Sequence, residues 1–460
     1  MSETTSTTNL DCPIDILGQQ PLLKIYTQIL LAFTVPDASA QSAIIDTLKR
    51  GLERLSESFP WVAGQVVNEG ASEGDSGVYK IKSLDKTPHL VVKDLSNDPS
   101  IPPFEEYRHG NFPMTLLDEQ VLCPRPTLPG GPSYLEGLDP VFLVQATFVK
   151  GGLLLSFLGH HMTMDMTGQG QVIELLSKSC RGEPFTAEEI AAHNIDRSLV
   201  IPFFDDSYDP APDLAKQIRK PLPAASADTQ TSPSPMSWVN YTFSASSLAT
   251  LKSVATSSLT TGFVSTDDAL SALIWQSVTR ARLPRLTGLD PSSTSATFAR
   301  AVDVRRYLGV TPLYPGLLQN MAYSNLTIQE LIDAPVGFVA AQLRLALDGQ
   351  KLAHATRALG TLMHRAKDKS AVSFTAAVDT SVGIMLSSWA KEKSYALDFG
   401  LGLGLPVSVR RPRFTPVEGL LYLLPKTLDG EVGLAVSLRD EDLERLKGDK
   451  VFMEYAKYIG

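Results

Sequence analysis

Residues 153–165 read LLLSFLGHHMTMD, an apolar run that leads into two histidines and an aspartate. The run is typical of a buried strand, and the apolar segment 141–149 forms the other arm of a predicted hairpin across a Lys-Gly-Gly turn. Apolar residues then recur at helical spacing over 170–180, so the motif lies at a strand-to-helix junction. Because histidine exchanges a proton near neutral pH, His160 and His161 are the first candidates for a general base.

The bulk composition is that of a globular protein with two domains. The chain has 460 residues, of which 43% are hydrophobic and 20% are charged. At roughly 100–200 residues per domain, more than one hydrophobic core is needed. Residues 201–237 are rich in proline and poor in apolar periodicity. We expect an N-terminal domain over 1–200, an inter-domain crossover over 201–237 and a C-terminal domain over 238–460.

Charge and cysteine usage exclude several classes of partner. The net charge of −9 argues against nucleic-acid binding, which needs a basic surface. Cys12, Cys123 and Cys180 are far apart and lack CxxC spacing, which argues against disulfides and a zinc site. The N-terminus lacks the features of a secretory signal, and no apolar run reaches the ~18 residues that span a membrane. We expect a cytoplasmic monomer with no nucleic-acid or membrane partner.

Before the motif, the N-terminal half alternates between strand and helix patterns. The predicted elements are a strand at 22–35, an amphipathic helix at 38–59 and a strand at 61–67. Gly70–Gly74 is a formal match to the GxSxG elbow of hydrolases, but the helix that must follow the serine is missing. Ser72 therefore reads as part of a hairpin turn. The proline-rich segment from Val92 onward reads as an irregular covering.

The C-terminal half begins a second alternation. Its predicted elements are strands at 238–243, 297–304, 382–388 and 433–438, helices at 246–257, 265–282 and 353–366, further helices between 320 and 347, and a closing helix at 440–458. The sequence DFGLGLG at 398–404 reads as a strand with one bare face against which another backbone packs. Its spacing departs from GxGxxG, so we reject a dinucleotide fingerprint.

The start of the helix at 265–282 has two interpretations. Ser265 and Thr266 are suitable N-cap residues, and the two aspartates after them suit the first turn. The same helix start presents free backbone N–H groups that bind a phosphate or a carbonyl. Both interpretations stay open at this point.

Three spaced motifs resemble the BAHD acyltransferase superfamily. His161 and Asp165 fit HxxxD, Ser387-Ser388-Trp389 fits the strand that precedes the third motif, and Asp398-Phe-Gly-Leu-Gly402 resembles DFGWG. Within the superfamily the chain is most similar to the fungal trichothecene 3-O-acetyltransferases. Leu401, which stands where the superfamily usually has tryptophan, is a further point of resemblance to this subgroup. The further segments that carry this resemblance are 60–66, 264–271, 314–321, 385–391 and 437–442.

The resemblance implies a two-domain α/β fold like that of chloramphenicol acetyltransferase, with mixed sheets and an active-site channel at the domain interface. It also implies an acetyl-CoA-dependent O-acetyltransferase that acetylates the C3 hydroxyl of trichothecenes, a detoxifying step. Acetyl-CoA is then a co-substrate, no metal is needed, and the acyl group passes directly to the acceptor in a ternary complex.

The resemblance also assigns roles to residues. HxxxD makes His161 the general base, although strand alternation alone leaves His160 open. Asp165 is expected to turn away and pair with Arg305, rather than to bind a metal or His161 across one helical turn. Ser387 is the candidate donor to the oxyanion. The expected structural supports are Trp389, Asp398 and Gly400.

Coenzyme A is polyanionic, so an acidic protein needs local cations to bind it. The candidates are Lys252, Arg410, Arg411 and Arg413, with the helix start at Ser265 and Thr266. Other functions stay open: an acyltransferase for another alcohol or acyl-CoA, an inactive scaffold, and, least favoured, a hydrolase.

Overall fold

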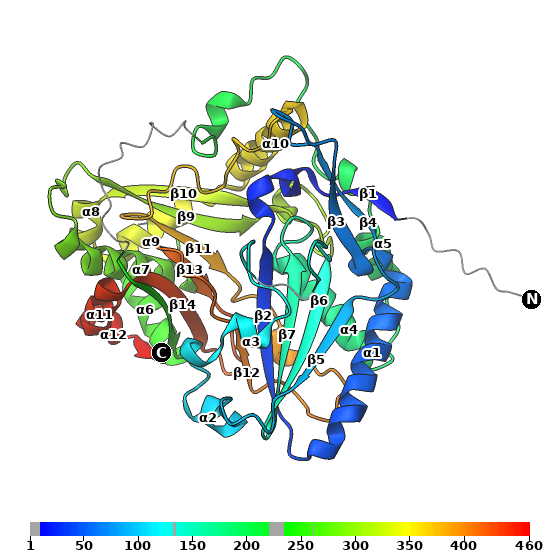
Figure 1. Ribbon diagram of the computed structural model, residues 1–460. Helices are drawn as coiled ribbons and strands as arrows, with labels where there is room; N and C mark the ends of the chain where they lie inside the picture. The colour runs from blue at the N-terminus through cyan, green and yellow to red at the C-terminus, as the bar shows by residue number, and fades with distance from the viewer. Residues whose placement is uncertain (1–9, 132–134, 220–233, 260) are drawn as a thin grey trace, which may run out of the picture.

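The computed structural model describes residues 10–131, 135–219, 234–259 and 261–460 (Figure 1). Two large sheets lie side by side, with most of the N-terminal half around one and most of the C-terminal half around the other. A smaller three-stranded sheet lies beside the N-terminal one. The fold class predicted from the sequence, mixed α/β, is confirmed.

The N-terminal sheet has five strands in the order β12-β2-β7-β6-β5. Their bounds are β12 Ser408–Arg410, β2 Tyr26–Thr34, β7 Gly152–His160, β6 Phe142–Val149 and β5 His89–Asp94. The predicted hairpin is present as the antiparallel pair β6 and β7. β12 comes from the C-terminal half and pairs with β2, so the chain returns to the first sheet before it completes the second.

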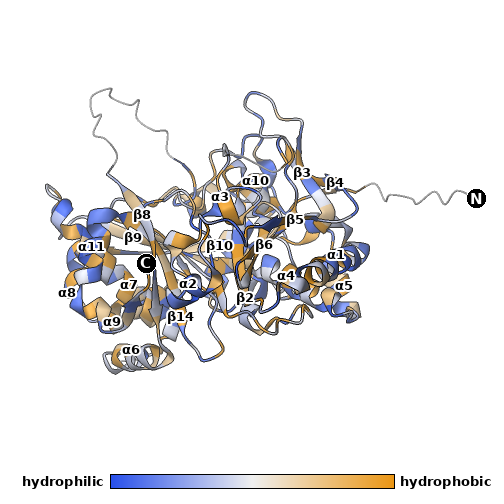
Figure 2. Cartoon of the chain, turned by 60° about the horizontal axis from the view of Figure 1, so that its bottom comes forward, coloured by the Kyte–Doolittle hydropathy of each residue, from blue (hydrophilic) through white to orange (hydrophobic). Residues whose placement is uncertain are grey.

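Helices cover both faces of this sheet. The helices α1 Gln41–Ser58 and α4 Met166–Cys180 pack on one face through alternate apolar residues of β2, β6 and β7. The short helices α2 Phe104–His109 and α3 Glu119–Leu122 cover the other face. Helix α5 Ala187–His193 follows α4 and begins with a capping box at Thr186. Figure 2 shows both hydrophobic and hydrophilic segments along the flanking helices, as amphipathic packing requires.

The three-stranded sheet has the order β1-β4-β3, with β1 Asp11–Pro13, β4 Val78–Ser83 and β3 Gly64–Glu69. The predicted strand at 61–67 starts too early, because Pro60–Ala63 forms a 3-10 turn that buries Trp61. The segment 70–74 lies in the turn that joins β3 to β4, and Gly70 and Gly74 have φ values of 76° and 75°. Ser72 is therefore a hairpin residue, as predicted.

The C-terminal sheet has seven strands in the order β10-β9-β11-β13-β14-β8-β15, and only β11 runs parallel to its neighbours. The strands are β8 Met236–Phe243, β9 Ser295–Asp303, β10 Gln319–Thr327, β11 Ile384–Ser388, β13 Leu420–Leu423, β14 Val432–Arg439 and β15 Ala456–Tyr458. The helices of this half are α6 Ala245–Ser257, α7 Thr266–Arg282, α8 Ile328–Asp333, α9 Val336–Leu345, α10 Gly349–Arg365, α11 Asp440–Gly448 and α12 Lys450–Met453.

Two predictions about the secondary structure of 319–327 and 440–458 are wrong. The strand β10 was expected to be loop and helix, because two of its four inward residues, Asn320 and Ser324, are polar and hide the apolar alternation. The closing helix at 440–458 is broken into α11, α12 and the edge strand β15. Asp449 causes the break, since its side chain accepts the N–H groups of Val451 and Phe452 and starts a new helix.

The segment 398–404 is a loop and not the predicted strand. Gly400, Gly402 and Gly404 have φ values of 65°, 76° and 70°, a region that strands do not use. A Cβ built on Gly402 or Gly404 would meet no atom of the described residues within 4 Å, so the expected close packing of another backbone is not found there. The loop is anchored instead by the buried ring of Phe399, which stacks on Phe157 at 5.6 Å.

The predicted crossover lies only partly within the described residues. Residues 201–219 are described, and Ile201 and Leu214 join a hydrophobic cluster with residues of the C-terminal half. Residues 220–233 lie outside the described part of the chain. None of the described helices is long and apolar enough to cross a membrane.

The glycines of the 398–404 loop give a first prediction. Gly402→Ala is expected to lower the free energy of unfolding by about 1–2 kcal/mol, because an alanine at a positive φ is strained even where space is free. The control is Gly448→Ala at the end of α11, which also has free space but no positive φ. Urea unfolding measures both. Equal stabilities would contradict the loop conformation.

Candidate active site

The site is built on a buried ion pair between the two halves of the chain. Asp165 is the N-cap of α4, and its carboxylate lies opposite the guanidinium of Arg305, which follows β9. The two pair in a bidentate manner, with Nη1 to Oδ2 and Nη2 to Oδ1 both at 2.9 Å. Arg305 is 1% exposed and Asp165 is 3% exposed. The pairing implied by the family resemblance is therefore present.

Every hydrogen-bonding position of this pair is occupied. Besides Arg305, the carboxylate of Asp165 accepts the N–H groups of Gly168 and Leu318, both at 2.9 Å. The remaining N–H groups of Arg305 donate to the carbonyls of Tyr314 and Gly316 and to the carboxylate of Asp303. Burial alone would lower the pKa of Arg305, but the charge of Asp165 raises it above its ordinary value. Asp165 thus has no oxygen free for a metal or for His161.

His161 follows the end of β7 and enters the site from a fixed loop. Its backbone N–H donates to the carbonyl of Ile25, and its ring Nδ1 lies 3.1 Å from the carbonyl of Met164. Since a carbonyl oxygen can only accept, Nδ1 carries the proton in the neutral ring. Nε2 is then left with a free lone pair, the form that a general base requires.

The electrostatic surroundings keep His161 neutral. The side chain is half-buried, and the loss of hydration lowers its pKa below the ordinary value. The Met164 hydrogen bond and the charge of Asp165 act in the opposite direction, while the charge of Arg411 lowers the pKa further. A neutral imidazole at pH 7 is ready to accept a proton.

His160 is a different kind of histidine. It lies on the opposite face of β7, is fully buried, and packs edge-on against the ring of Tyr26 at 5.0 Å. Burial lowers its pKa to about 3. Neither ring nitrogen has a hydrogen-bond partner among the described residues. The ring serves as an apolar aromatic side chain, which favours His161 over His160 as the base.

The predicted oxyanion donor, Ser387, lies in β11 next to a buried tryptophan. Trp389 Nε1 donates to Ser387 Oγ at 3.1 Å, which leaves the hydroxyl hydrogen of Ser387 free to donate elsewhere. The neighbouring Ser388 is already committed, because its Oγ donates to Asp267 at 2.8 Å. The Trp389 ring is 2% exposed and packs on Tyr422.

The third motif ties its loop to α4. The carboxylate of Asp398 accepts the N–H of Gly400 at 2.8 Å, and its carbonyl accepts the hydroxyl of Ser177 at 2.8 Å. A Cβ on Gly400 would lie 3.1 Å from the side chain of Arg181, a second reason for glycine there. The contacts of Asp398 and Gly400 are those of structural supports.

The residues proposed to bind coenzyme A do not form one cluster of free cations. Lys252 is exposed on α6, whereas Arg410 and Arg411 are 5% and 2% exposed. Arg410 donates to Tyr395 and to the carbonyl of Asn111. The guanidinium of Arg411 lies 3.9 Å from the ring centre of Phe414 and donates to Thr127. Arg413 pairs with Asp118 at 2.8 Å.

The predicted anion site at the start of α7 is occupied by side chains of the protein itself. Ser265 Oγ accepts the N–H of Asp268, and the carboxylate of Asp268 accepts the N–H of Ser265. Asp268 also pairs with the buried Arg300 at 3.1 Å. The capping interpretation is confirmed for Ser265, whereas Thr266 is the first residue of the helix and does not cap it. The carboxylate of Asp268 occupies the place of an incoming anion.

Two family profiles match this chain. The profile of the trichothecene 3-O-acetyltransferase-like N-terminal domain matches residues 25–180, and the profile of the Transferase family matches residues 132–453. The chain belongs to the Transferase family. This membership agrees with the resemblance inferred from the spaced motifs.

Relatives within the family match over nearly the whole chain. The trichothecene 3-O-acetyltransferase TRI101 of Fusarium sporotrichioides is 50% identical over 100% of this chain and 99% of its own. The O-acetyltransferase dmxR13 of Cryptosporiopsis sp. is 51% identical over 98% of both. TRI101 of F. graminearum, complexed with coenzyme A and deoxynivalenol, superposes with a TM-score of 0.93 at 48% identity, covering 98% of this chain and 100% of that one.

The fold is shared more widely. Vinorine synthase superposes with a TM-score of 0.64 at 16% identity, covering 97% of this chain and 93% of its own. At this identity the likeness concerns the fold alone.

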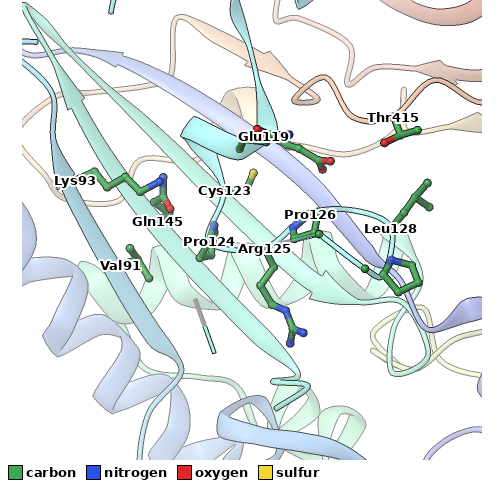
Figure 3. A pocket seen from close by; sticks show the side chains of 14 residues that line it. Val91, Lys93, Glu119, Cys123, Pro124, Arg125, Pro126, Leu128, Gln145 and Thr415 are labelled. Carbon is green, nitrogen blue, oxygen red and sulfur yellow. The ribbon is translucent and has the colours of Figure 1, made fainter. Parts of the chain in front are cut away.

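A cavity of about 550 Å³ lies between the N-terminal sheet and the segment 119–131 (Figure 3). Its polar lining includes Lys93, Glu119, Arg125 and Gln145, and its lining does not include His161 or Ser387. Lys93 Nζ donates to the carbonyl of Val121, and Glu119 accepts three hydrogen bonds, so these groups are engaged within the protein. No group of three metal-ligating side chains occurs among residues 10–131, 135–219, 234–259 and 261–460.

Sequence reasoning missed two acids near the ion pair, the buried Asp15 and the partly buried Glu392. Asp15 is 1% exposed and pairs with Arg197 at 3.0 Å. Its signal was a lone charge between Ile14 and Ile16, an environment that disfavours an unpaired carboxylate. Glu392 has its pKa raised to about 8, first by burial and then by the charge of Asp165. No motif pointed to Glu392.

The ion pair gives a second prediction. Asp165→Asn is expected to lower the free energy of unfolding by about 3–5 kcal/mol, because it leaves the charge of Arg305 buried without its partner. Chemical denaturation measures this loss. The control is Asp303→Asn, which removes the other, 45% exposed carboxylate of Arg305 and should change stability by about 0–1 kcal/mol. Equal losses for both variants would contradict the assignment of Asp165 as the essential partner.

Proposed function

We propose that this protein transfers the acetyl group of acetyl-CoA to the C3 hydroxyl of a trichothecene, a detoxifying reaction. The observation that carries the proposal is the hydrogen bond from Nδ1 of His161 to the carbonyl of Met164, which leaves Nε2 as a base. The relatives named trichothecene 3-O-acetyltransferase support the choice of acceptor. The structure of one relative with coenzyme A and deoxynivalenol supports both substrates.

The reaction needs one base and one oxyanion donor. Nε2 of His161 takes the hydroxyl proton while the hydroxyl oxygen attacks the thioester carbonyl. The resulting tetrahedral oxyanion accepts a hydrogen bond, for which we propose the free hydroxyl hydrogen of Ser387. When the intermediate collapses, the carbon–sulfur bond breaks and the departing thiolate takes the proton from His161. The products are the acetyl ester and free coenzyme A, and no acyl-enzyme forms.

A second candidate is acetylation of a different alcohol. The relative dmxR13, named only as an O-acetyltransferase, is 51% identical to this chain, against 50% for the trichothecene enzyme of F. sporotrichioides. The two identities are nearly equal, so overall similarity does not choose between the acceptors. The chemistry at His161 is the same in both cases.

We further propose the domain limits and the setting. The N-terminal domain spans 1–200 and the C-terminal domain spans 238–460, with the crossover between them and a substrate channel at their interface. The two large sheets support this division, and β12 is the exception that links them. The three cysteines are free thiols, which supports a reducing cytoplasmic location. We propose that the enzyme acts as a monomer.

The proposal is tested by mixing acetyl-CoA with deoxynivalenol and other alcohols and following free thiol. Release of thiol that depends on a trichothecene, with acetyl ester at C3, is expected. Release that depends only on another alcohol would favour the second candidate. Release without any acceptor would indicate a hydrolase, and no release would indicate an inactive scaffold.

A matched pair of histidine variants gives a third prediction. His161→Ala is expected to lower kcat by roughly 10²–10⁴-fold, because it removes the base. His160→Phe is the control and is expected to keep near-native kcat, because His160 packs only as an aromatic ring against Tyr26. Steady-state thiol release measures both. Loss of activity in His160→Phe with activity kept in His161→Ala would reverse the assignment.

The pH dependence gives a fourth prediction. His161 is active as a base only when it is neutral, that is, above its own pKa. Because burial lowers that pKa, the midpoint of the acid limb is expected below pH 6.5, the ordinary histidine value. A pH profile of kcat/KM measures the acid limb. A midpoint above 6.5 would contradict the proposed environment.

A further inference from the structure

A second buried arginine, Arg197, also holds the loop 160–165. Nη1 of Arg197 donates to the carbonyl of Thr163 at 2.6 Å and to Oδ2 of Asp15 at 3.0 Å. Arg197 is 7% exposed, and its guanidinium lies over the ring of Trp61 at 4.6 Å. The mechanism described above does not use this cluster.

Asp15 is held in turn by the C-terminal half. The hydroxyl of Tyr314 donates to its Oδ1, and the backbone N–H of Leu317 donates to its Oδ2 at 3.2 Å. The next residue, Leu318, donates its N–H to Asp165 at 2.9 Å. One backbone segment, 314–318, therefore fixes both aspartates, and the two arginine–aspartate pairs form a single network around the loop.

The contact made by Arg197 lies one peptide unit from the acceptor that orients His161. The carbonyl of Thr163 belongs to the peptide that enters Met164, and the carbonyl of Met164 accepts the proton on Nδ1 of His161. The N–H of Thr163 is fixed as well, by the carbonyl of His160 at 2.9 Å. The peptide that joins Thr163 to Met164 is rigid, so fixing its carbonyl leaves only φ and ψ of Met164 to set the direction of the next carbonyl.

We infer that Arg197 is a positioning residue that fixes the peptide between Thr163 and Met164 and thereby keeps the proton of His161 on Nδ1. This inference rests on the proposed function, in which Nε2 of His161 is the base. Without Arg197 the Met164 carbonyl turns, the ring also populates the form protonated on Nε2, and that form cannot accept a proton from the acceptor hydroxyl.

A purely structural role of Arg197 predicts different results. If Arg197 only stabilises the fold, its removal lowers stability and leaves the position of the His161 proton unchanged. If it positions the loop, a small displacement of the base lowers kcat by about 10-fold or more, since a misplacement of ~1 Å can reduce a rate by up to 10²-fold. The KM for acetyl-CoA is expected to stay unchanged, because no contact to coenzyme A is removed.

The fifth prediction compares Arg197→Met with the native enzyme, both labelled with ¹⁵N on the histidine rings. Two-bond ¹⁵N–¹H spectra report which ring nitrogen carries the proton, and the His161 signals are assigned by their loss in His161→Ala. The native ring is expected to be protonated on Nδ1 and the variant to show both forms, with kcat about 10-fold lower. If Arg197→Met does not fold, Arg197→Gln serves instead, since its shorter side chain stays polar beside Asp15 without reaching Thr163.

The control is Arg285→Met. Arg285 also pairs with a buried aspartate, Asp442 at 2.8 Å, and lies in the C-terminal half with no contact to the loop 160–165. The Arg285→Met variant is expected to be less stable than the native enzyme and to keep the native tautomer of His161 and the native kcat. A folded Arg197 variant with the native tautomer and native kcat would overturn the inference. Because the spectra need no acceptor, the inference can fail or hold independently of whether a trichothecene is acetylated.

Discussion

The bidentate ion pair between Asp165 and Arg305 is the contact on which the arrangement of the site depends. It joins residues 140 positions apart and is buried on both sides. Taking two charges out of water is unfavourable unless every lone pair and N–H finds a partner, and here all of them do. The main effect of such a pair is to hold the two chain segments that carry it in fixed positions. It fixes the start of α4 against the end of β9, and the loop that carries His161 is stretched between these points and the end of β7.

The fixed loop explains how two adjacent histidines acquire different properties. The ring of His160 packs against Tyr26, which lies opposite it on β2, and there it is desolvated and has no hydrogen-bond partner among the described residues. His161 comes after the last residue of the strand, where the chain turns and the Met164 carbonyl reaches its Nδ1. Burial lowers the pKa of both rings, but only His161 combines a neutral ring with a defined tautomer. The hydrogen bonding of the two histidine rings, more than the direction of their pKa shifts, distinguishes His161 from His160.

Much of this arrangement could be predicted from local patterns. The hairpin β6–β7 and the helix α4 follow from apolar runs and a turn, and the pairing of Asp165 with Arg305 follows from the family pattern. Other features depend on contacts that no local pattern contains. β10 was missed because Asn320 and Ser324 point inward, where they are held by long-range hydrogen bonds. The alternating glycines of 398–404 were mistaken for a strand because spacing does not reveal the sign of φ. Arg197 lies 182 positions from Asp15, so its role appears only in the folded chain.

Within the Transferase family, the groups proposed for proton transfer can be considered separately from the groups that choose the acceptor. In the proposed mechanism the proton transfer uses His161 and its carbonyl acceptor, and the two buried aspartates hold the loop that carries them. A protein can therefore keep the network intact while the walls that contact the acceptor change. Relatives named for a trichothecene substrate and for O-acetylation alone are almost equally similar to this chain, at 50% and 51% identity. We therefore propose that the network around residues 160–165 serves the acetyl transfer and that residues outside it select the acceptor.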